Sequence, residues 1–271
     1  MSQDALRILW INPLGFPDYD QPMGDYINSI KSPGVEVEVV SFISDARMNN
    51  LEYRTYEALI VGDTVKVTRY AAEQGFDAVI IGCFYDPALE DAREISGEAI
   101  VVAPCQASVQ IAANLANNFS VIIGQEKWRA QMTERVRHYG YGARLASMRS
   151  IDIAAHDLQQ DCGLTASRII EAGRRAVEED RAEALILGCT CSFGLAEKVQ
   201  EELGVPVIDP IIAAYKAAEY LGGLKRQFGW VPSRKWGSEA PPEDQIRAFG
   251  LFQAAPPIGN KRHYPAGGLN Q

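Results

Sequence analysis

Two short segments of the chain carry nearly the same sequence. Asp77–Phe84 and Glu183–Thr190 each begin with an acidic residue, continue as an apolar run and then reach Gly-Cys and one further residue. An apolar run of this length between turn residues is typical of a buried parallel strand. Ligands of open parallel sheets bind beyond the carboxyl ends of the strands. Cys83 and Cys189 are therefore predicted at equivalent ligand-binding positions in two similar halves.

The spacing of this repeat predicts a duplicated α/β unit. Cys83 and Cys189 lie 106 positions apart, and Val101-Val102 stands 106 positions before Val207-Ile208. The predicted strands are 7–13, 35–43, 77–83 and 99–105 in the first half, and 119–124, 145–151, 183–189 and 205–209 in the second. Helical patterns separate them, which implies right-handed crossovers and a parallel sheet in each half.

The predicted fold class is therefore α/β, with two pseudo-symmetric domains that each hold a four-stranded, mainly parallel sheet flanked by helices. The active site is expected in the interdomain cleft. The first domain takes residues 1–113 plus 211–224, where the helix predicted over 210–221 returns to it, and the second takes 114–210. Residues 225–271 are rich in Pro and Gly and are predicted as an irregular C-terminal tail. Their aromatic residues leave two interpretations open, a flexible tail or a segment that wraps the body or a neighbouring subunit.

Charge and composition exclude several classes of protein. The net charge is −9 and Lys and Arg form no concentrated patch, which argues against nucleic acid as the main partner. The apolar stretches are too short to cross a bilayer, and Met1–Asp4 does not open a secretory signal, so we expect no membrane partner and a cytoplasmic protein. Five cysteines, an odd number, favour reduced thiols over a disulfide framework. Dinucleotide and P-loop fingerprints are absent from the sequence.

Two thiols at equivalent strand ends suit one kind of chemistry. Inverting a carbon stereocentre by proton transfer needs a base on one face of the carbon and an acid on the other. A helix that starts just after each cysteine would favour the thiolate through its dipole and free N–H groups. The carbanion also needs donors aimed at its developing oxyanion, and the backbone N–H groups of Phe84 and Thr190 are the candidates.

Other reactive side chains are predicted to have structural roles. Cys105 is expected to end the fourth strand, where it either packs or lines the pocket; Cys191 is expected to pack near a cap, and Cys162 to lie in a loop or the core. Cys-x-Cys is too tight for the usual zinc knuckle, so no metal site is expected. Asp86 is predicted to cap the helix that follows it, and Asp209 either to cap the next helix or to hold a pocket loop. The three histidines, His138, His156 and His263, are predicted at the surface.

The chain resembles the aspartate/glutamate racemase superfamily, and within it the hydantoin and allantoin racemase branch. The resemblance rests on Ile8–Pro13, Gly82–Leu89, Leu187–Thr190 and Val205–Asp209, and it covers about residues 6 to 222. It implies a cofactor-independent racemase with two α/β domains, a small-molecule substrate and a homo-oligomeric state. Carried over by motif, Cys83 and Cys189 are the acid/base pair. Asn12, Phe84, Gly188 and Thr190 are the substrate-binding residues.

The sequence departs from the family pattern at residues that meet the substrate. Ile123-Gly124 stands where the family commonly has a Thr pair that helps to bind polar substrate groups, and Asn12-Pro13-Leu14 stands where it often has Asn-Pro-Asn. These departures leave the substrate open. Two alternatives also remain. One is another reaction on the same fold that uses Cys83 and Cys189, such as racemisation of another amino-acid derivative, a cis-trans isomerisation or a decarboxylation. The other is a ligand-binding or redox-sensing role that uses Cys189 and Cys191.

Overall fold

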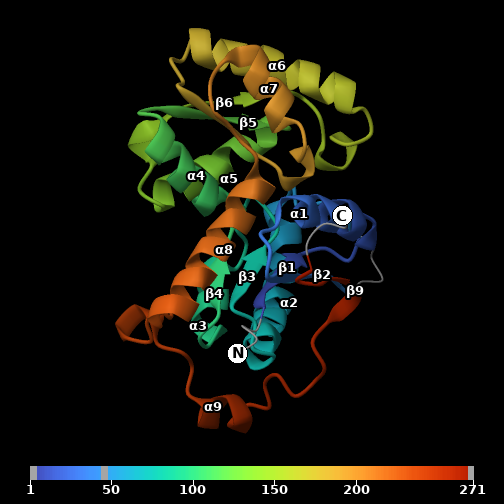
Figure 1. Ribbon diagram of the computed structural model, residues 1–271, viewed down its shortest axis with the longest axis vertical. Helices are drawn as coiled ribbons and strands as arrows, with labels where there is room; N and C mark the ends of the chain where they lie inside the picture. The colour runs from blue at the N-terminus through green and yellow to red at the C-terminus, as the bar shows by residue number, and fades with distance from the viewer. Residues whose placement is uncertain (1–4, 44–47, 268–271) are drawn as a thin grey trace. The chain divides into compact units, whose positions relative to one another are not determined.

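The computed structural model describes residues 5–43 and 48–267, and its contacts divide the chain into two compact units (Figure 1). The first unit comprises residues 1–82, 87–102 and 215–271, and the second comprises 83–86 and 103–214. The short segment Cys83–Asp86 thus belongs with the second unit, although the strand before it belongs to the first. The domain boundaries at 113/114 and 210/211 stay a prediction about independently folding domains.

The first unit is built on a five-stranded mixed sheet. Its strands, in the order β4-β3-β1-β2-β9, are β4 (Ile100–Val102), β3 (Ala78–Ile81), β1 (Leu6–Asn12), β2 (Val35–Phe42) and β9 (Ile258–Tyr264). Its helices are α1 (Asp20–Ile30), α2 (Arg54–Glu73), α3 (Leu89–Ile95), α9 (Glu243–Ala248) and the part of α8 (Pro210–Phe228) from Tyr215 onward. Pairing is parallel among β1 to β4, and β9 pairs antiparallel with β2.

The second unit holds a sheet whose pairings are all parallel. Its strands, in the order β6-β5-β7-β8, are β6 (Leu145–Ser150), β5 (Phe119–Ile123), β7 (Ala184–Leu187) and β8 (Val207–Ile208). Its helices are α4 (Pro104–Leu115), α5 (Arg129–His138), α6 (Cys162–Glu178) and α7 (Ala196–Leu203). In Figure 1, α6 and α7 lie on one side of β5 and β6, and α4 and α5 lie on the other.

The predicted duplication is confirmed by the topology. In each unit the first strand sits centrally, the second lies on one side of it, and the third and fourth lie on the other. The central strands are buried on both faces: Ile8–Ile11 in β1 and Ile80-Ile81 in β3 are 0% exposed. Burial on both faces explains the continuous apolar runs in the sequence, because a strand with one solvated face would alternate. The fold class is confirmed, and β9 adds a fifth strand that the repeat does not contain.

Strand β9 comes from the segment that the sequence predicts as an irregular tail. It covers the outer edge of β2, with Glu38 opposite His263 and Ser41 opposite Asn260. The residues of β9 are half-buried or exposed and do not alternate regularly between buried and exposed positions. The sequence therefore shows no two-residue hydrophobic period from which this strand could be predicted. An uncovered strand edge exposes unpaired N–H and C=O groups, and β9 satisfies those of β2.

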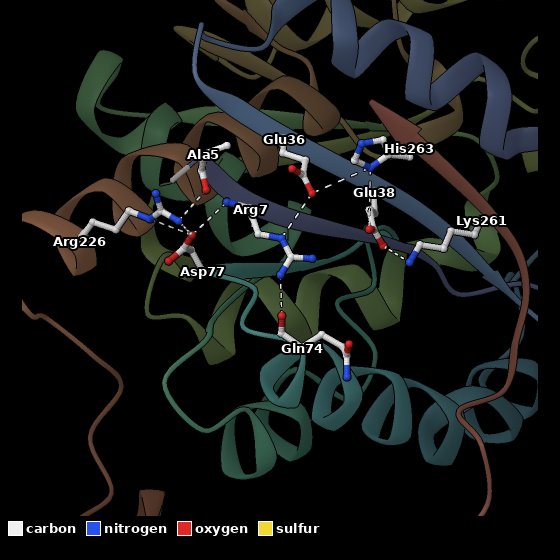
Figure 2. Close-up of polar contacts among 9 residues, drawn as sticks. All are labelled: Ala5, Arg7, Glu36, Glu38, Gln74, Asp77, Arg226, Lys261 and His263. Carbon is white, nitrogen blue, oxygen red and sulfur yellow. Dashed lines mark hydrogen bonds and ion pairs between the residues drawn. The ribbon is translucent and has the colours of Figure 1, made fainter. Parts of the chain in front are cut away.

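Charged side chains tie β9 and α8 to this sheet (Figure 2). Arg7 donates to Glu36 and to the carbonyl of Gln74, and its guanidinium stacks on the ring of Phe76 at 4.3 Å. Lys261 of β9 pairs with the buried Glu38 across 2.5 Å. On the other side of the sheet, Arg226 of α8 donates to Asp77 at 2.6 and 2.9 Å. These contacts attach β9 and the end of α8 to the body of the first unit.

Among residues 5–43 and 48–267, no helix combines the length and the apolar character that crossing a bilayer requires.

Candidate functional site

The two Gly-Cys segments are built in the same way. The N–H of Gly82 donates to the carbonyl of Ile11 on β1 at 2.7 Å, and the N–H of Gly188 donates to the carbonyl of Ile122 on β5 at 2.7 Å. Each glycine therefore adds one hydrogen bond to the parallel pairing with the central strand, just beyond the end of its own strand. Both cysteines leave the sheet at equivalent positions, as the repeat predicts.

Close approach of the backbones explains why both positions are glycine. A Cβ atom on Gly82 would lie 2.5 Å from Trp10 Nε1 and 2.7 Å from the carbonyl oxygen of Ile11, and one on Gly188 would lie 2.8 Å from the carbonyl oxygen of Ile122. Separations this short do not occur for a real Cβ atom, so any side chain would push the strand end outward. Neither glycine has the positive φ that favours the residue elsewhere.

A tight turn follows each cysteine. The carbonyl of Cys83 accepts from the N–H of Asp86 at 2.9 Å, and the carbonyl of Cys189 accepts from the N–H of Ser192 at 3.0 Å. Both cysteines are partly exposed, and neither forms a disulfide. A thiol in this setting stays accessible to a small molecule, whereas a fully buried thiol does not.

The α-helices begin later than the sequence predicts. Helix α3 begins at Leu89 and α7 at Ala196, with a 3₁₀ turn over Thr190–Ser192 between Cys189 and α7. A helix therefore follows Cys189 directly only as this 3₁₀ turn, and the α-helices start several residues after each cysteine. The backbone makes a tight turn after each cysteine before the α-helix begins.

Asp86 is bound to a different helix from the one predicted. It lies fully buried with φ of 51° and accepts from the N–H groups of Cys105 at 2.8 Å and Gln106 at 2.9 Å. These N–H groups belong to the first turn of α4, whose own N-cap residue, Ala103, has no side chain able to cap it. The cysteine loop thus supplies the cap of α4. Cys105 correspondingly lies in α4 and not at the end of the fourth strand.

Tyr139, just after α5, completes the surroundings of this carboxylate. Its hydroxyl donates to Asp86 Oδ2 at 2.7 Å. Burial raises the pKa of Asp86 to about 7, and the hydrogen bonds from Tyr139, Cys105 and Gln106 oppose that rise. Burial also raises the pKa of the Cys105 thiol, with the Asp86 carboxylate acting in the same direction. Cys105 is therefore a neutral, packed thiol beside the loop of Cys83.

In the second half, the helix after the last strand is capped by the residue that directly precedes it. Asp209 directly precedes α8, and its Oδ1 accepts from the N–H groups of Ile211 at 2.8 Å and Ile212 at 3.2 Å. Its Oδ2 accepts from the N–H of Gly194 at 3.1 Å, in the loop that follows Cys189. Both roles that the sequence left open for Asp209 are present. In each half, a carboxylate thus joins the cysteine loop to the helix after the last strand.

Gln159 holds the loop of Cys189 from the other side. Its side-chain amide donates to the carbonyls of Cys191 at 2.8 Å and Phe193 at 3.2 Å. Cys191 is buried within this loop, as predicted for a packing residue, while Cys162 is exposed at the start of α6. The sequence did not single out Gln159 or Tyr139, since neither lies in a motif and each acts through a contact distant in the chain.

The remaining predicted substrate-binding residues differ in what they can offer. Phe84 and Thr190 are only 2% and 5% exposed as whole residues. Asn12, the last residue of β1, is buried, and its side-chain amide donates to Asp20 Oδ1 at 2.7 Å and to the carbonyl of Phe16 at 3.2 Å. Both of its donor hydrogens are thus engaged within the protein, and the carbonyl oxygen is the side-chain atom left to accept another hydrogen bond.

The histidines lie at the surface, as predicted. One of them, His263, lies within 4.8 Å of Glu36 and Glu38, a grouping of the kind that holds metal ions. Arg7 and Lys261 already pair with these two carboxylates, as Figure 2 shows. The cluster is therefore explained as an ion-pair network that fastens β9 to β2.

Comparisons with known proteins agree with this architecture. A model of the Asp/Glu/Hydantoin racemase family matches residues 11–218. The chain is 32% identical over 197 residues to a hydantoin racemase of Pseudomonas sp. (strain NS671), which covers 73% of this chain and 79% of the relative. It is 31% identical over 242 residues to a hydantoin racemase of Paenarthrobacter aurescens, covering 89% and 99% respectively. The structure of an allantoin racemase from Klebsiella pneumoniae matches with a TM-score of 0.81 and 28% identity, covering 88% of this chain and 95% of that one.

Proposed function

Because the chain belongs to the Asp/Glu/hydantoin racemase family, and is thus an isomerase of the racemase type, we propose that it inverts the acidic carbon of a 5-substituted hydantoin or a related cyclic ureide. Cys83 and Cys189 serve as the acid and base of this reaction. The observation that carries the proposal is the matching construction of the two Gly-Cys strand ends, each with a glycine hydrogen-bonded to the central strand and a partly exposed cysteine after it.

In the proposed reaction, one cysteine acts as a thiolate and removes the proton from the stereocentre. The C–H electron pair moves toward the adjacent carbonyl and gives an enolate. The other cysteine, as a thiol, returns a proton to the opposite face of the carbon, and the carbonyl reforms. Each turnover exchanges the protonation states of Cys83 and Cys189, so the enzyme works in both directions with equal groups. Proton transfer from positioned side chains of this kind contributes about 10²- to 10⁴-fold to a rate.

The enolate needs donors at its oxygen, and the turns after the cysteines supply them in this proposal. Phe84 and Thr190 each follow a cysteine directly, and Gly188 holds the second strand end in place. Loss of one such donor typically costs about 10²- to 10³-fold in kcat. We assign this role to the N–H groups of Phe84 and Thr190 because each residue directly follows a cysteine.

Asn12 has the complementary role of an acceptor. Its amide hydrogens are engaged by Asp20 and Phe16, so its carbonyl oxygen is the atom available to a ligand. A cyclic ureide carries ring N–H groups beside its carbonyls, and one of these would donate to Asn12. In this proposal Asn12 therefore acts as an acceptor and not as a donor.

The end of β5 favours an apolar substituent on the substrate. Ile123 is 0% exposed, and Gly124 is covered by the indole of Trp128 and the carbonyl of Ile153. Ile123 and Gly124 therefore offer a ligand no side-chain donor or acceptor at a strand end adjacent to Gly188. We expect a hydantoin with an alkyl or benzyl substituent to be preferred over allantoin, whose substituent is a polar ureido group.

We also propose that the protein is a cytoplasmic homo-oligomer. The five cysteines form no disulfide, which fits a reducing cytoplasm, and the exposed aromatic residues Tyr220, Trp230 and Trp236 fit a homo-oligomer contact in the C-terminal part. Light scattering on the purified chain gives the oligomeric state directly, and a monomeric mass at micromolar concentration would contradict the second proposal.

The experiment is the decay of circular dichroism from single enantiomers of 5-benzyl-, 5-isopropyl- and 5-methylhydantoin and of allantoin. The Cys83→Ala/Cys189→Ala double variant serves as the blank, because ureides also racemise spontaneously. Decay to zero that depends on the unaltered enzyme supports the proposal, and a faster decay for the benzyl compound supports the assignment at β5. Decay no faster than the blank for every compound contradicts the proposed substrate class.

A further inference from the structure

Asp20 at the start of α1 collects donors from three neighbouring strands. The side chain is fully buried. Its Oδ1 accepts from Asn12 of β1 at 2.7 Å, and its Oδ2 accepts from Ser41 of β2 at 2.8 Å and from Asn260 of β9 at 2.7 Å. All three donors are neutral. A buried carboxylate is stable only where hydrogen bonds replace its hydration, so each of these donors matters to its placement.

The register of β9 places Asn260 at this carboxylate. Asn260 lies opposite Ser41 in the sheet, and both side chains donate to the same oxygen. The pairing then slips, with Ile258 opposite Phe42, so that Gly259 is an extra residue in β9. A Cβ atom on Gly259 would lie 2.8 Å from the carbonyl oxygen of Phe42. This bulge redirects the strand next to Asn260, which is a common use of bulges beside functional sites.

The two donors on Oδ2 fix the rotation of the carboxylate. With Ser41 and Asn260 bound to one oxygen, the other oxygen is held toward the amide of Asn12. That amide has a second bond, to the carbonyl of Phe16, so its plane is set from two sides. The direction of the Asn12 carbonyl oxygen therefore depends on a residue of the C-terminal strand, 248 positions further along the chain.

We propose that Asn260 is a positioning residue for substrate binding, which acts through Asp20 to orient the Asn12 carbonyl toward a ring N–H of the substrate. The inference rests on the proposed function, in which Asn12 accepts from a cyclic ureide. It gives the C-terminal segment, which lies beyond the family match at residue 218, an indirect part in substrate binding.

The test compares Asn260→Ala with Tyr264→Phe. Tyr264 lies on the same face of β9 and donates to Asp25 of α1 at 3.1 Å, so its loss removes a similar bond between β9 and α1 away from Asn12. We expect Asn260→Ala to raise KM for the hydantoin about tenfold, equivalent to about 1.4 kcal/mol, with kcat within about twofold, and Tyr264→Phe to leave both unchanged. In an Asn12→Ala background, Asn260→Ala should have no further effect on KM.

A second measurement follows the network without substrate. The side-chain amide protons of Asn12, observed by ¹⁵N NMR, should exchange slowly in the unaltered chain and in Tyr264→Phe, and faster in Asn260→Ala. Faster exchange with an unchanged KM overturns the positioning role, and unchanged exchange overturns the network itself. Failure of the proposed function gives a different result, because the unaltered chain then racemises no ureide in the panel. That result overturns the role of Asn260 in substrate binding, whereas the exchange measurement still tests the hydrogen-bond network.

Discussion

Tyr139 Oη donates to Asp86 Oδ2 over 2.7 Å, and this bond lies where the cysteine loop, the start of α4 and the end of α5 meet. Asp86 is three residues past Cys83, and its own N–H closes the turn onto the Cys83 carbonyl. The carboxylate thus holds the loop at one end while the strand holds it at the other. The position of the Cys83 thiol follows from both attachments.

Replacing Asp86 should disturb catalysis more than an ordinary helix cap does. An amide at this position has one acceptor oxygen for three donors, so Asp86→Asn leaves at least one donor facing an NH2 group. A displacement of the thiol by about 1 Å costs roughly 10²-fold in rate. We expect kcat to fall by roughly 10- to 10²-fold and the free energy of unfolding by about 1–3 kcal/mol.

The control for Asp86→Asn is Asp161→Ala. Asp161 caps α6 by accepting from the N–H of Leu164 at 2.9 Å, and it lies outside both cysteine loops. Its loss should cost about 1 kcal/mol of stability while leaving racemisation unchanged. Equal losses of activity per folded molecule in the two variants would show that Asp86 has no special relation to Cys83.

The raised pKa of Asp86 predicts a pH dependence of stability. Its pKa lies at about 7 in the folded protein and near its ordinary 3.8 when unfolded, so the folded state binds the proton more tightly. This contribution is complete below about pH 4 and is lost as the pH rises toward and through 7, by roughly 4 kcal/mol at most. Urea unfolding of the unaltered chain and of Asp86→Asn between pH 4 and 8 measures it. The difference in stability between the two should shift in favour of Asp86→Asn as the pH rises, and a constant difference would contradict the prediction.

The Tyr139→Phe variant tests the same carboxylate by removing one of its hydrogen-bond donors. Removing the hydroxyl takes away a donor that favours the ionised form, so the pKa of Asp86 should rise above its present value. The loss of stability with pH should then extend to higher pH than in the unaltered chain. The aromatic ring is retained, so packing around residue 139 changes little. An unchanged pH midpoint would indicate that the Tyr139 bond contributes nothing to the proton affinity of Asp86.

The glycines before the cysteines should not tolerate alanine. Gly82→Ala and Gly188→Ala each place a methyl group less than 3 Å from backbone carbonyl oxygens of the central strands. We expect each to cost about 1–3 kcal/mol and to lower kcat, because relief of the clash moves the cysteine. Gly62→Ala in α2 is the matched control, since no atom lies within 4 Å of its Cβ position. It should stabilise the protein by about 0.5–1 kcal/mol. Thermal melts and racemisation rates separate the two cases.

Single cysteine variants should assign a thiol to each face of the substrate. Cys83→Ser and Cys189→Ser are each expected to abolish racemisation, because one face then lacks its acid or base. Each is still expected to exchange the α-proton of one enantiomer with solvent deuterium, which proton NMR follows directly. Cys162→Ser, at an exposed cysteine, is the control and should keep full activity. Full racemisation by either of the first two variants would exclude the two-cysteine mechanism.

Much of the fold could be predicted because its information is local. Apolar runs such as Ala78–Ile81 and Ala184–Leu187 indicate strands buried on both faces, and the 106-residue repeat predicts that the two sheets share one topology. The candidate site could be predicted for the same reason, because the Gly-Cys end of each strand is recognised from the residues next to it in the sequence. Strand β9 escaped prediction because an edge strand with mixed exposure leaves no hydrophobic period.

The sequence by itself determined the duplicated α/β architecture, the parallel strands and the two cysteines at their ends. These features depend on the hydrophobic pattern and the turn residues of short continuous segments, so they can be recognised from neighbouring residues. Only the tertiary structure decided that Asp86 caps α4, that Tyr139 binds it, and that Asn260 reaches Asp20 beside Asn12. These are hydrogen bonds between residues 19, 53 and 240 positions apart. A single polar side chain satisfies its partner wherever the packed sheets and helices bring the two together, and nothing in the neighbouring sequence specifies which partner that is.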